Sequence, residues 1–265
     1  MSFDWHVPAA IPVFAATVLL VYVLVKIWHS RRQRTAPWLM ATIAILLAWS
    51  VGLILELTSV RLPDKFLWAT LQFVPIMLLP LVWLLTLRRI VDARAPRRWW
   101  QAAGWAITAL LITSVLVNPG HLFHGTPYID VVNGERALNY DYHLLFFAAF
   151  VPWAAALLVT SSALLIRGMS QTPFIFRRRN QILLAASLLP LAGLAVYLTD
   201  TMPWHSFDPT FICVSVAVLL CGYAVLRYRV FDVVPLARDA VIQHLAAGVV
   251  VIDVGGRVID FNKVA

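Results

Sequence analysis

Two hydrogen-bonding side chains accompany long apolar segments of this sequence and could contact a ligand: Glu56 at the end of one segment and Gln72 within the next. Placing a carboxylate inside or at the edge of a membrane costs free energy, so we expect Glu56 to have a functional role. Gln72 precedes Pro75 and Pro80, which remove helical hydrogen bonds and allow a kink that could open a cavity. Each residue also has a structural alternative: Glu56 could pair with Arg61 in the headgroup region, and Gln72 could only join two helices.

Histidines form a second group with potential chemistry, because five of the seven fall on the predicted outer side of the apolar segments, together with most carboxylates. Imidazole and carboxylate suit Zn, Cu or Ni, and imidazole titrates near pH 6.5, so the group could hold a metal or report pH. His121-x2-His124 alone is a sparse metal motif, and interfacial residues bonded to water are the alternative. We expect no metal or other cofactor; if a metal were bound, His121 and His124 would be the candidate ligands. The five are His6, His121, His124, His143 and His205.

Most of the 11 tryptophans lie near the ends of apolar segments, where aromatic side chains anchor a protein at the membrane interface. Trp49, Trp83, Trp105 and Trp153 lie deeper and are candidates to line a pocket. Packing inside a helix bundle, or contact with lipid, is the alternative for all four.

The elements that position these residues are predicted to be membrane-spanning helices. The chain is 61% hydrophobic and 13% charged, whereas a soluble domain is about 45–50% apolar and about 25% charged. Seven windows of 18–23 residues lack Asp, Glu, Lys and Arg, and one crossing takes about 20 residues. We therefore predict an all-α membrane protein with a seven-transmembrane helix bundle. The windows are Val7–Val25, Pro37–Leu55, Phe66–Leu87, Trp99–Val117, Leu144–Ile166, Asn180–Thr199 and Pro209–Leu226.

The basic residues predict how this bundle is oriented. Eighteen of the 21 Lys and Arg residues lie after the first, third, fifth and seventh windows, and three lie in the intervening connections. Cytoplasmic loops carry the excess of Lys and Arg. The N-terminus is therefore predicted outside and the C-terminus in the cytoplasm. Because topology explains the net charge of +8, we do not expect a nucleic acid partner.

Two segments outside the windows have their own patterns. In the outer connection, Asn133-Gly134 between two β-prone runs is typical of a type I′ hairpin; an irregular loop is the alternative. We divide the chain into a seven-transmembrane domain at 1–227, a juxtamembrane helix at 228–247, and the first strands of a truncated domain at 248–265. Pro235 suits the first turn of that helix, and its coiled-coil seam is Val230, Val234, Ala237 and Val241.

Several short motifs follow one another along the chain. They are Trp49-x2-Gly52-x3-Glu56, Trp68-x2-Leu71-Gln72-Phe73 through Leu79-Pro80-x2-Trp83, Asn118-x2-His121-x2-His124, Arg178-Arg179-x-Gln181, and Tyr223-Ala-x2-Arg227-Tyr-Arg229 before Asp232-x2-Pro235. In this order they resemble the N-terminal seven-transmembrane sensor region of bacterial histidine kinases. The segment VIQHLAAGVVVIDVGGRVIDFNKVA resembles the start of a PAS domain.

The resemblance implies a receptor in the bacterial cytoplasmic (inner) membrane that relays a small-molecule signal to PAS and kinase domains. Its implied partners are the lipid bilayer, a small ligand, a second copy in a homodimer, and a downstream response regulator. A diguanylate cyclase output and a small-solute transporter are the alternatives. No phosphoacceptor His box or ATP lid is present, so we expect no catalytic residue. The candidate ligand-binding residues are Trp49, Glu56, Trp68, Gln72, Trp83, His121 and His124, and the candidate relay residues are Arg227, Arg229, Val230, Val234, Pro235 and Val241.

Overall fold

The structure is a computed structural model of all 265 residues. It describes residues 3–4, 7–29, 31–32, 35–91, 98–132, 135–170, 177–199, 209–227, 247–248, 250–252, 258–261 and 264. The chain divides into two compact units, Met1–Tyr228 and Arg229–Ala265, which we describe separately.

Seven helices in the described part of the chain are long and apolar enough to cross a membrane, and each overlaps one predicted window. The prediction of seven transmembrane helices is therefore confirmed. A π-helical turn at Phe146–Phe150 leads directly into the fifth helix. The helices are α1 (Ala10–Trp28), α2 (Ala36–Thr58), α3 (Leu62–Ile90), α4 (Arg98–Val117), α5 (Val151–Ser170), α6 (Arg177–Leu198) and α7 (Pro209–Arg227).

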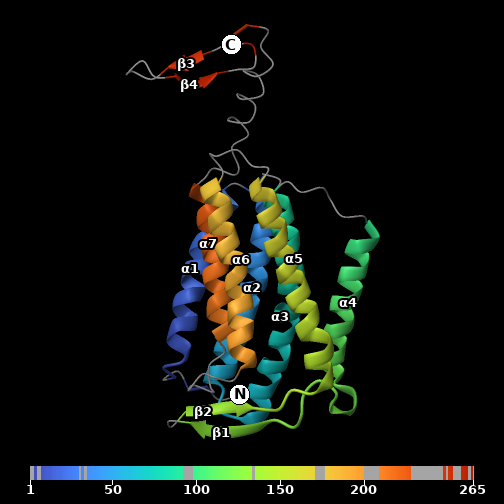
Figure 1. Cartoon of the computed structure of the whole chain (residues 1–265). Coiled ribbons are helices and arrows are strands. Elements are labelled where there is room, and N and C mark those ends of the chain that lie inside the picture. The colour runs from blue at the N-terminus through green and yellow to red at the C-terminus, as the bar shows by residue number, and fades with distance from the viewer. Residues whose placement is uncertain are drawn as a thin grey trace. The chain divides into compact units, whose positions relative to one another are not determined.

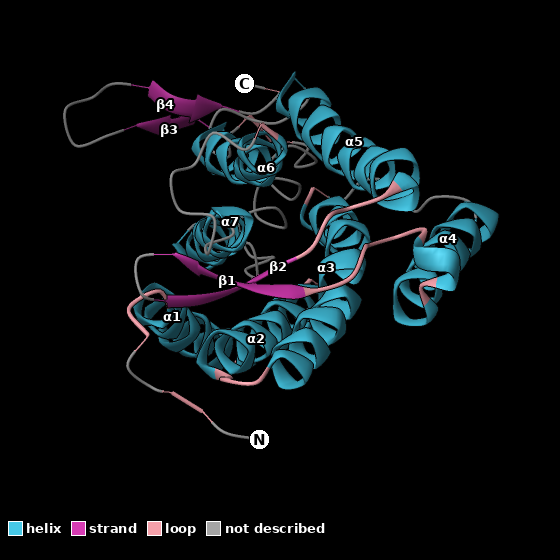
Figure 2. Cartoon of the chain, turned by 90° about the horizontal axis from the view of Figure 1, so that it is seen from below, coloured by secondary structure: helices cyan, strands magenta, loops and turns pink. Residues whose placement is uncertain are grey.

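Six of these helices close a ring, and α4 stands outside it (Figures 1 and 2). Each helix of the ring contacts the next one, in the order α1, α2, α3, α5, α6 and α7, and α7 contacts α1 to complete it. Helix α4 packs mainly on α3. The share of side chains buried within the protein is therefore largest for α3 and smallest for α4. Seen along the helices, α3 borders α2, α4 and α5 and so connects α4 to the ring (Figure 2).

Small hydroxyl side chains join the helices inside the ring. Thr42 of α2 and Thr86 of α3 are 2.8 Å apart between their Oγ1 atoms. Ser162 of α5 and Ser187 of α6 are 3.0 Å apart between their Oγ atoms. Helix pairs in lipid gain little from the hydrophobic effect, so close packing and such polar contacts hold them together.

A two-stranded antiparallel hairpin lies across one end of the bundle (Figure 2). Strand β1 (Tyr128–Val132) pairs with β2 (Glu135–Asn139), and Val132 is opposite Glu135. The predicted turn at Asn133-Gly134 falls between these partners, outside the described residues. We call this the hairpin end of the bundle; a short 3₁₀ turn (Pro119–His121) at the end of α4 lies there too.

The second unit contains a separate hairpin. Strand β3 (Val250–Ile252) pairs with β4 (Val258–Phe261) in antiparallel register. Both strands fall in the segment that resembles the start of a PAS domain, and the PAS assignment stays a prediction. The predicted juxtamembrane helix at 228–247, including Arg229, Val230, Val234, Pro235 and Val241, lies outside the described residues except for Ala247.

Candidate ligand-binding site

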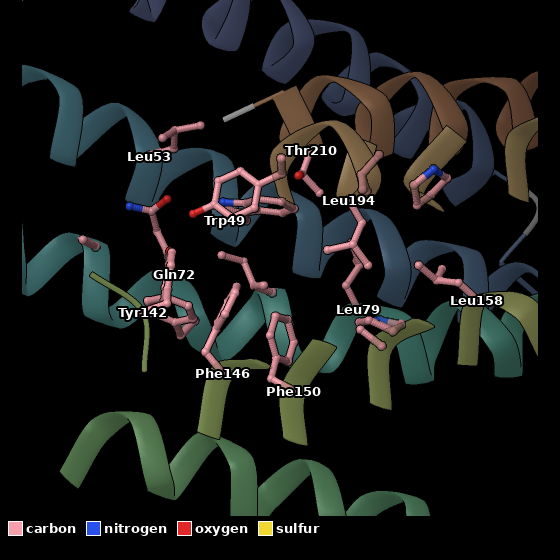
Figure 3. Close-up of a pocket in the computed structure, with 18 of the residues that line it drawn as sticks. Trp49, Leu53, Gln72, Leu79, Tyr142, Phe146, Phe150, Leu158, Leu194 and Thr210 are labelled. Atoms are coloured by element: carbon pink, nitrogen blue, oxygen red, sulfur yellow. The ribbon is translucent and has the colours of Figure 1, made fainter. Parts of the chain in front are cut away.

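A cavity of about 250 Å³ lies inside the bundle near its hairpin end (Figure 3). Its walls come from α2, α3, α5, α6 and α7, and strand β2 with the segment after it closes one side. The cavity volume lies just below the range of about 300–1,000 Å³ that is common for ligand pockets, so it suits only a small molecule. Prolines at two of its walls, Pro80 of α3 and Pro190 of α6, remove helical hydrogen bonds next to the cavity.

The polar corner of the cavity is a hydrogen-bonded pair from two helices. Gln72 of α3 is 5% exposed, and its Nε2 donates to Oε2 of Glu56 on α2 at 2.5 Å. The pair is close because α2 has a glycine at position 52, where a Cβ would lie 2.6 Å from Gln72 Cγ. Gln72 therefore joins two helices and also lines the cavity, and its role in ligand binding stays a prediction.

A buried lysine stands next to this pair. Lys65, in the first turns of α3, donates from Nζ to the carbonyl oxygens of Glu56 at 2.9 Å and Leu57 at 3.2 Å. Its ammonium thus satisfies carbonyl groups at the C-terminal end of α2, where a positive charge also favours the helix dipole. Lys65 is 2% exposed and is not among the described residues that line the cavity.

Aromatic rings form another part of the cavity lining. Tyr142 stacks on Phe146 with ring centroids 3.8 Å apart and planes 18° apart. Phe146 also contacts Phe150, one π-helical turn later, with ring centroids 5.6 Å apart. Single π-helical turns are rare and recur at functional sites. Figure 3 shows Tyr142, Phe146 and Phe150 directed into the space that Gln72 and Trp49 face from the other helices.

Burial raises the pKa of the Tyr142 phenol well above its usual value of 10.0, and the neighbouring Tyr140 and Tyr197 act in the same direction. All three tyrosines line the cavity. The Tyr142 phenol therefore stays protonated at neutral pH and is a hydrogen-bonding group there, not a charge.

The cavity brings together four of the seven predicted ligand-binding residues. Trp49, Glu56, Gln72 and Trp83 line the cavity together. Trp68, His121 and His124 are not among its described lining residues. Trp68 is half-buried, and its Nε1 is buried without a hydrogen-bond acceptor in the described residues.

The two histidines belong to the connection between α4 and β1. Asn118 adopts a left-handed conformation with φ of 42°, and its Oδ1 accepts a hydrogen bond from Phe123 N at 3.0 Å. Its Nδ2 donates to the carbonyl oxygen of His124 at 2.9 Å. His124 is 4% exposed, whereas His121 is exposed; both border a second, separate cavity. No group of three or more His, Cys, Asp or Glu residues within the described ranges could hold a metal ion.

Two of the four deep tryptophans proposed for a pocket are not among the described residues that line this one. Trp105 is 41% exposed on the outer surface of α4, the helix outside the ring. Trp153 packs against the leucine cluster around Leu84 and Leu157. Trp105 and Trp153 therefore agree with the alternative to pocket lining, because α4 stands outside the ring and α5 packs Trp153 against leucines.

Several lining residues did not stand out in the sequence. Their only signal was the aromatic spacing Tyr140-x-Tyr142-x3-Phe146-x3-Phe150, which continues to Ala154 and Leu158 on one face of α5. For the lining residues that α6 and α7 contribute, nothing in the sequence set them apart from other apolar helix positions. These residues are Pro190, Leu194, Tyr197, Thr210, Val214, Ala217 and Val218.

Comparison with protein families agrees with this architecture. A family model described as the N-terminal 7TM region of histidine kinase matches residues 12–235, from α1 to beyond the end of α7. The chain belongs to this family. No curated protein matches the chain.

Membership in the histidine kinase 7TM family and the seven apolar helices together make the chain a multi-pass membrane protein. They also indicate a sensory transmembrane module. The cavity of this 7TM region is enclosed by five of its seven helices, so an occupant would contact most of the bundle at once.

Proposed function

We propose that this chain is the receptor module of a sensor histidine kinase in the bacterial inner membrane, and that the cavity is its ligand site. The observation that carries the proposal is the cavity itself, with a carboxylate and a buried amide in hydrogen-bonding contact among apolar walls. Binding sites are commonly such apolar pockets with a few placed polar groups. The predicted orientation puts the hairpin end outside, so the ligand would enter from the extracytoplasmic side or from the membrane.

Helix α7 is the element best suited to carry the signal onward. It contributes Thr210 and Val218 to the cavity and ends at Arg227, on the way to the juxtamembrane segment. A ligand that favours one packing of α7 shifts the population of that packing by its differential affinity. We propose that this shift passes along Arg227, Arg229, Val230, Val234, Pro235 and Val241 to a PAS domain and a kinase core in a homodimer, and from there to a response regulator.

The first test is to read the gene beyond the codon for Ala265. We expect a completed PAS domain followed by a phosphoacceptor histidine and an ATP-binding core. A diguanylate cyclase core there would agree with the receptor role but would mean that the output is a cyclase instead of a kinase. A stop codon at that point would contradict the kinase proposal.

The second test fills the cavity in the full-length protein. Ala154→Phe on α5 adds a ring at a buried lining position, and Ala156→Phe on the same helix adds it at a position outside the described lining. We expect Ala154→Phe to change the rate of autophosphorylation from ATP in membrane vesicles by severalfold, with Ala156→Phe near wild type. Equal rates for all three proteins would contradict a regulatory cavity.

A further inference from the structure

We propose that the cavity binds a small uncharged carbonyl compound, whose oxygen accepts a hydrogen bond from the indole N–H of Trp83. This inference rests on the proposed function, because it names the class of ligand for the same site.

Trp83 carries a buried hydrogen-bond donor that is unpaired within the described part of the chain. Its side chain is 3% exposed, and its Nε1 has no hydrogen-bond partner among the described residues. An indole N–H can only donate, and a buried one usually has a partner. Leaving a buried donor unpaired costs free energy, so a ligand that accepts from Trp83 removes that cost.

The cavity is the place where a ligand can reach Trp83. Three tryptophans, Trp68, Trp83 and Trp153, have a buried Nε1 that lacks a partner among the residues that the structure describes. Of these three, Trp83 is the one that is a described lining residue of the cavity. For Trp83, therefore, an acceptor carried by a ligand can supply the missing hydrogen bond.

Trp83 lies far from the polar pair of Glu56 and Gln72. It follows Gln72 by eleven residues on α3, which is about 16 Å along the helix axis. Glu56 has further interactions within the protein besides its bond with Gln72. The proposed ligand therefore takes its hydrogen bond from Trp83 and needs none from Glu56.

The walls at the Trp83 end of the cavity are apolar and disfavour a charged ligand. On α3 the lining residues before Trp83 are Leu79 and Pro80, and the lining of α5 ends at Leu158. Figure 3 shows Leu158 at the end of the cavity opposite Gln72. An ionised group would lose its hydration among such side chains without compensation.

These walls also distinguish a carbonyl group from a hydroxyl group. A hydroxyl carries a proton of its own, and the side chains of Leu79, Pro80 and Leu158 provide no acceptor for it. A carbonyl oxygen only accepts, so the bond from Trp83 satisfies it. The volume of about 250 Å³ limits the rest of the ligand to the size of one ring with a short chain.

The test compares two uncharged probes of one shape, acetophenone and α-methylstyrene. In α-methylstyrene a CH₂ group replaces the carbonyl oxygen, and benzoate serves as the anionic analogue. Binding is measured by calorimetry on the chain in lipid nanodiscs, with empty nanodiscs of the same lipid as the blank. We expect both uncharged probes to bind to the wild type, and benzoate to bind more weakly than acetophenone.

The matched variants are Trp83→Phe and Trp153→Phe. Each removes an indole N–H that is buried and unpaired within the described residues, but Trp153 is not a described lining residue. We expect Trp83→Phe to weaken acetophenone binding about three- to tenfold, as the loss of one hydrogen bond would give, and α-methylstyrene binding less than about twofold. Persistent binding of α-methylstyrene shows that the cavity of Trp83→Phe is still folded. Trp153→Phe should leave both affinities close to wild type.

The outcomes distinguish this inference from the proposed function. Equal weakening of both uncharged probes by Trp83→Phe, or an unchanged acetophenone affinity, overturns the role of Trp83 but leaves the cavity as a ligand site. An acetophenone loss in Trp153→Phe equal to that in Trp83→Phe does the same. Benzoate binding as tight as that of acetophenone overturns the uncharged class, and absence of binding by both uncharged probes overturns the carbonyl class. Failure of the receptor proposal appears in a different experiment, as an unchanged rate of autophosphorylation in Ala154→Phe.

Discussion

Gly52 and Gln72 share one contact that holds the polar corner of the cavity together. A Cβ on Gly52 would lie 2.6 Å from Gln72 Cγ, closer than side chains approach. The missing side chain on α2 gives the Gln72 side chain of α3 a path to Glu56, one turn further along α2. The Glu56–Gln72 hydrogen bond therefore depends on a residue that has no side chain of its own.

Gly52→Ala should break this arrangement. The added methyl group must displace the middle of the Gln72 side chain, and overpacking of this kind costs about 1–3 kcal/mol. We expect a lower midpoint of thermal unfolding in detergent and a weakened Glu56–Gln72 coupling. Val51→Ala, at the neighbouring exposed position on α2, is the control and should stay close to wild type. An unchanged midpoint in Gly52→Ala would mean that α2 and α3 can separate without cost.

The Glu56–Gln72 hydrogen bond should appear as a coupling energy. Interhelical hydrogen bonds in membrane proteins average about 0.6 kcal/mol and reach about 1.7 kcal/mol. A double-mutant cycle with Glu56→Leu and Gln72→Leu, each of which removes its side of the hydrogen bond, should give a coupling in this range when unfolding is measured in mixed micelles. Additive effects of the two substitutions would show that the bond contributes nothing to stability.

Phe146→Ala should be much more damaging than Phe147→Ala. Phe146 is 2% exposed and stacks on Tyr142, whereas Phe147 is 54% exposed. Removing a buried phenyl ring costs about 3–5 kcal/mol, and here it would also free the Tyr142 ring. Thermal unfolding of both variants checks the expectation, and similar midpoints would contradict the packing described for the π-helical turn.

Alkaline pH should destabilise the folded chain through Tyr142. Its folded-state pKa is raised above 10.0, so between the unfolded and folded values the folded state holds a proton that the unfolded state releases. The stability from this protonated phenol is complete below the unfolded pKa and falls as the pH rises from about 10 toward the folded value. Unfolding midpoints measured from about pH 8 to about pH 11 should fall less steeply in Tyr142→Phe. If the unfolding midpoint fell equally steeply with pH in the wild type and in Tyr142→Phe, the predicted contribution of Tyr142 would be contradicted.

The seven spans were predictable because a membrane imposes a simple rule on sequence. Each crossing needs about 20 apolar residues, and charge is excluded from it, so the windows could be read directly and match α1 to α7. The hairpin signal at Asn133-Gly134 was equally local, and the two strands that flank it pair in the structure. Such features depend on neighbours in the chain.

The cavity depends on which helices pack together, and apolar spans carry little information about that. Uniformly apolar helices have no polar face to indicate their partners, so the sequence could propose Glu56 and Gln72 but not their contact across α2 and α3. The position of α4 outside the ring removed Trp105 from the candidates. The ring also brought Tyr142, Tyr197 and Thr210 to the same cavity. Composition and charge determined that this chain spans a membrane seven times, whereas side-chain packing between distant helices decided where a ligand can bind.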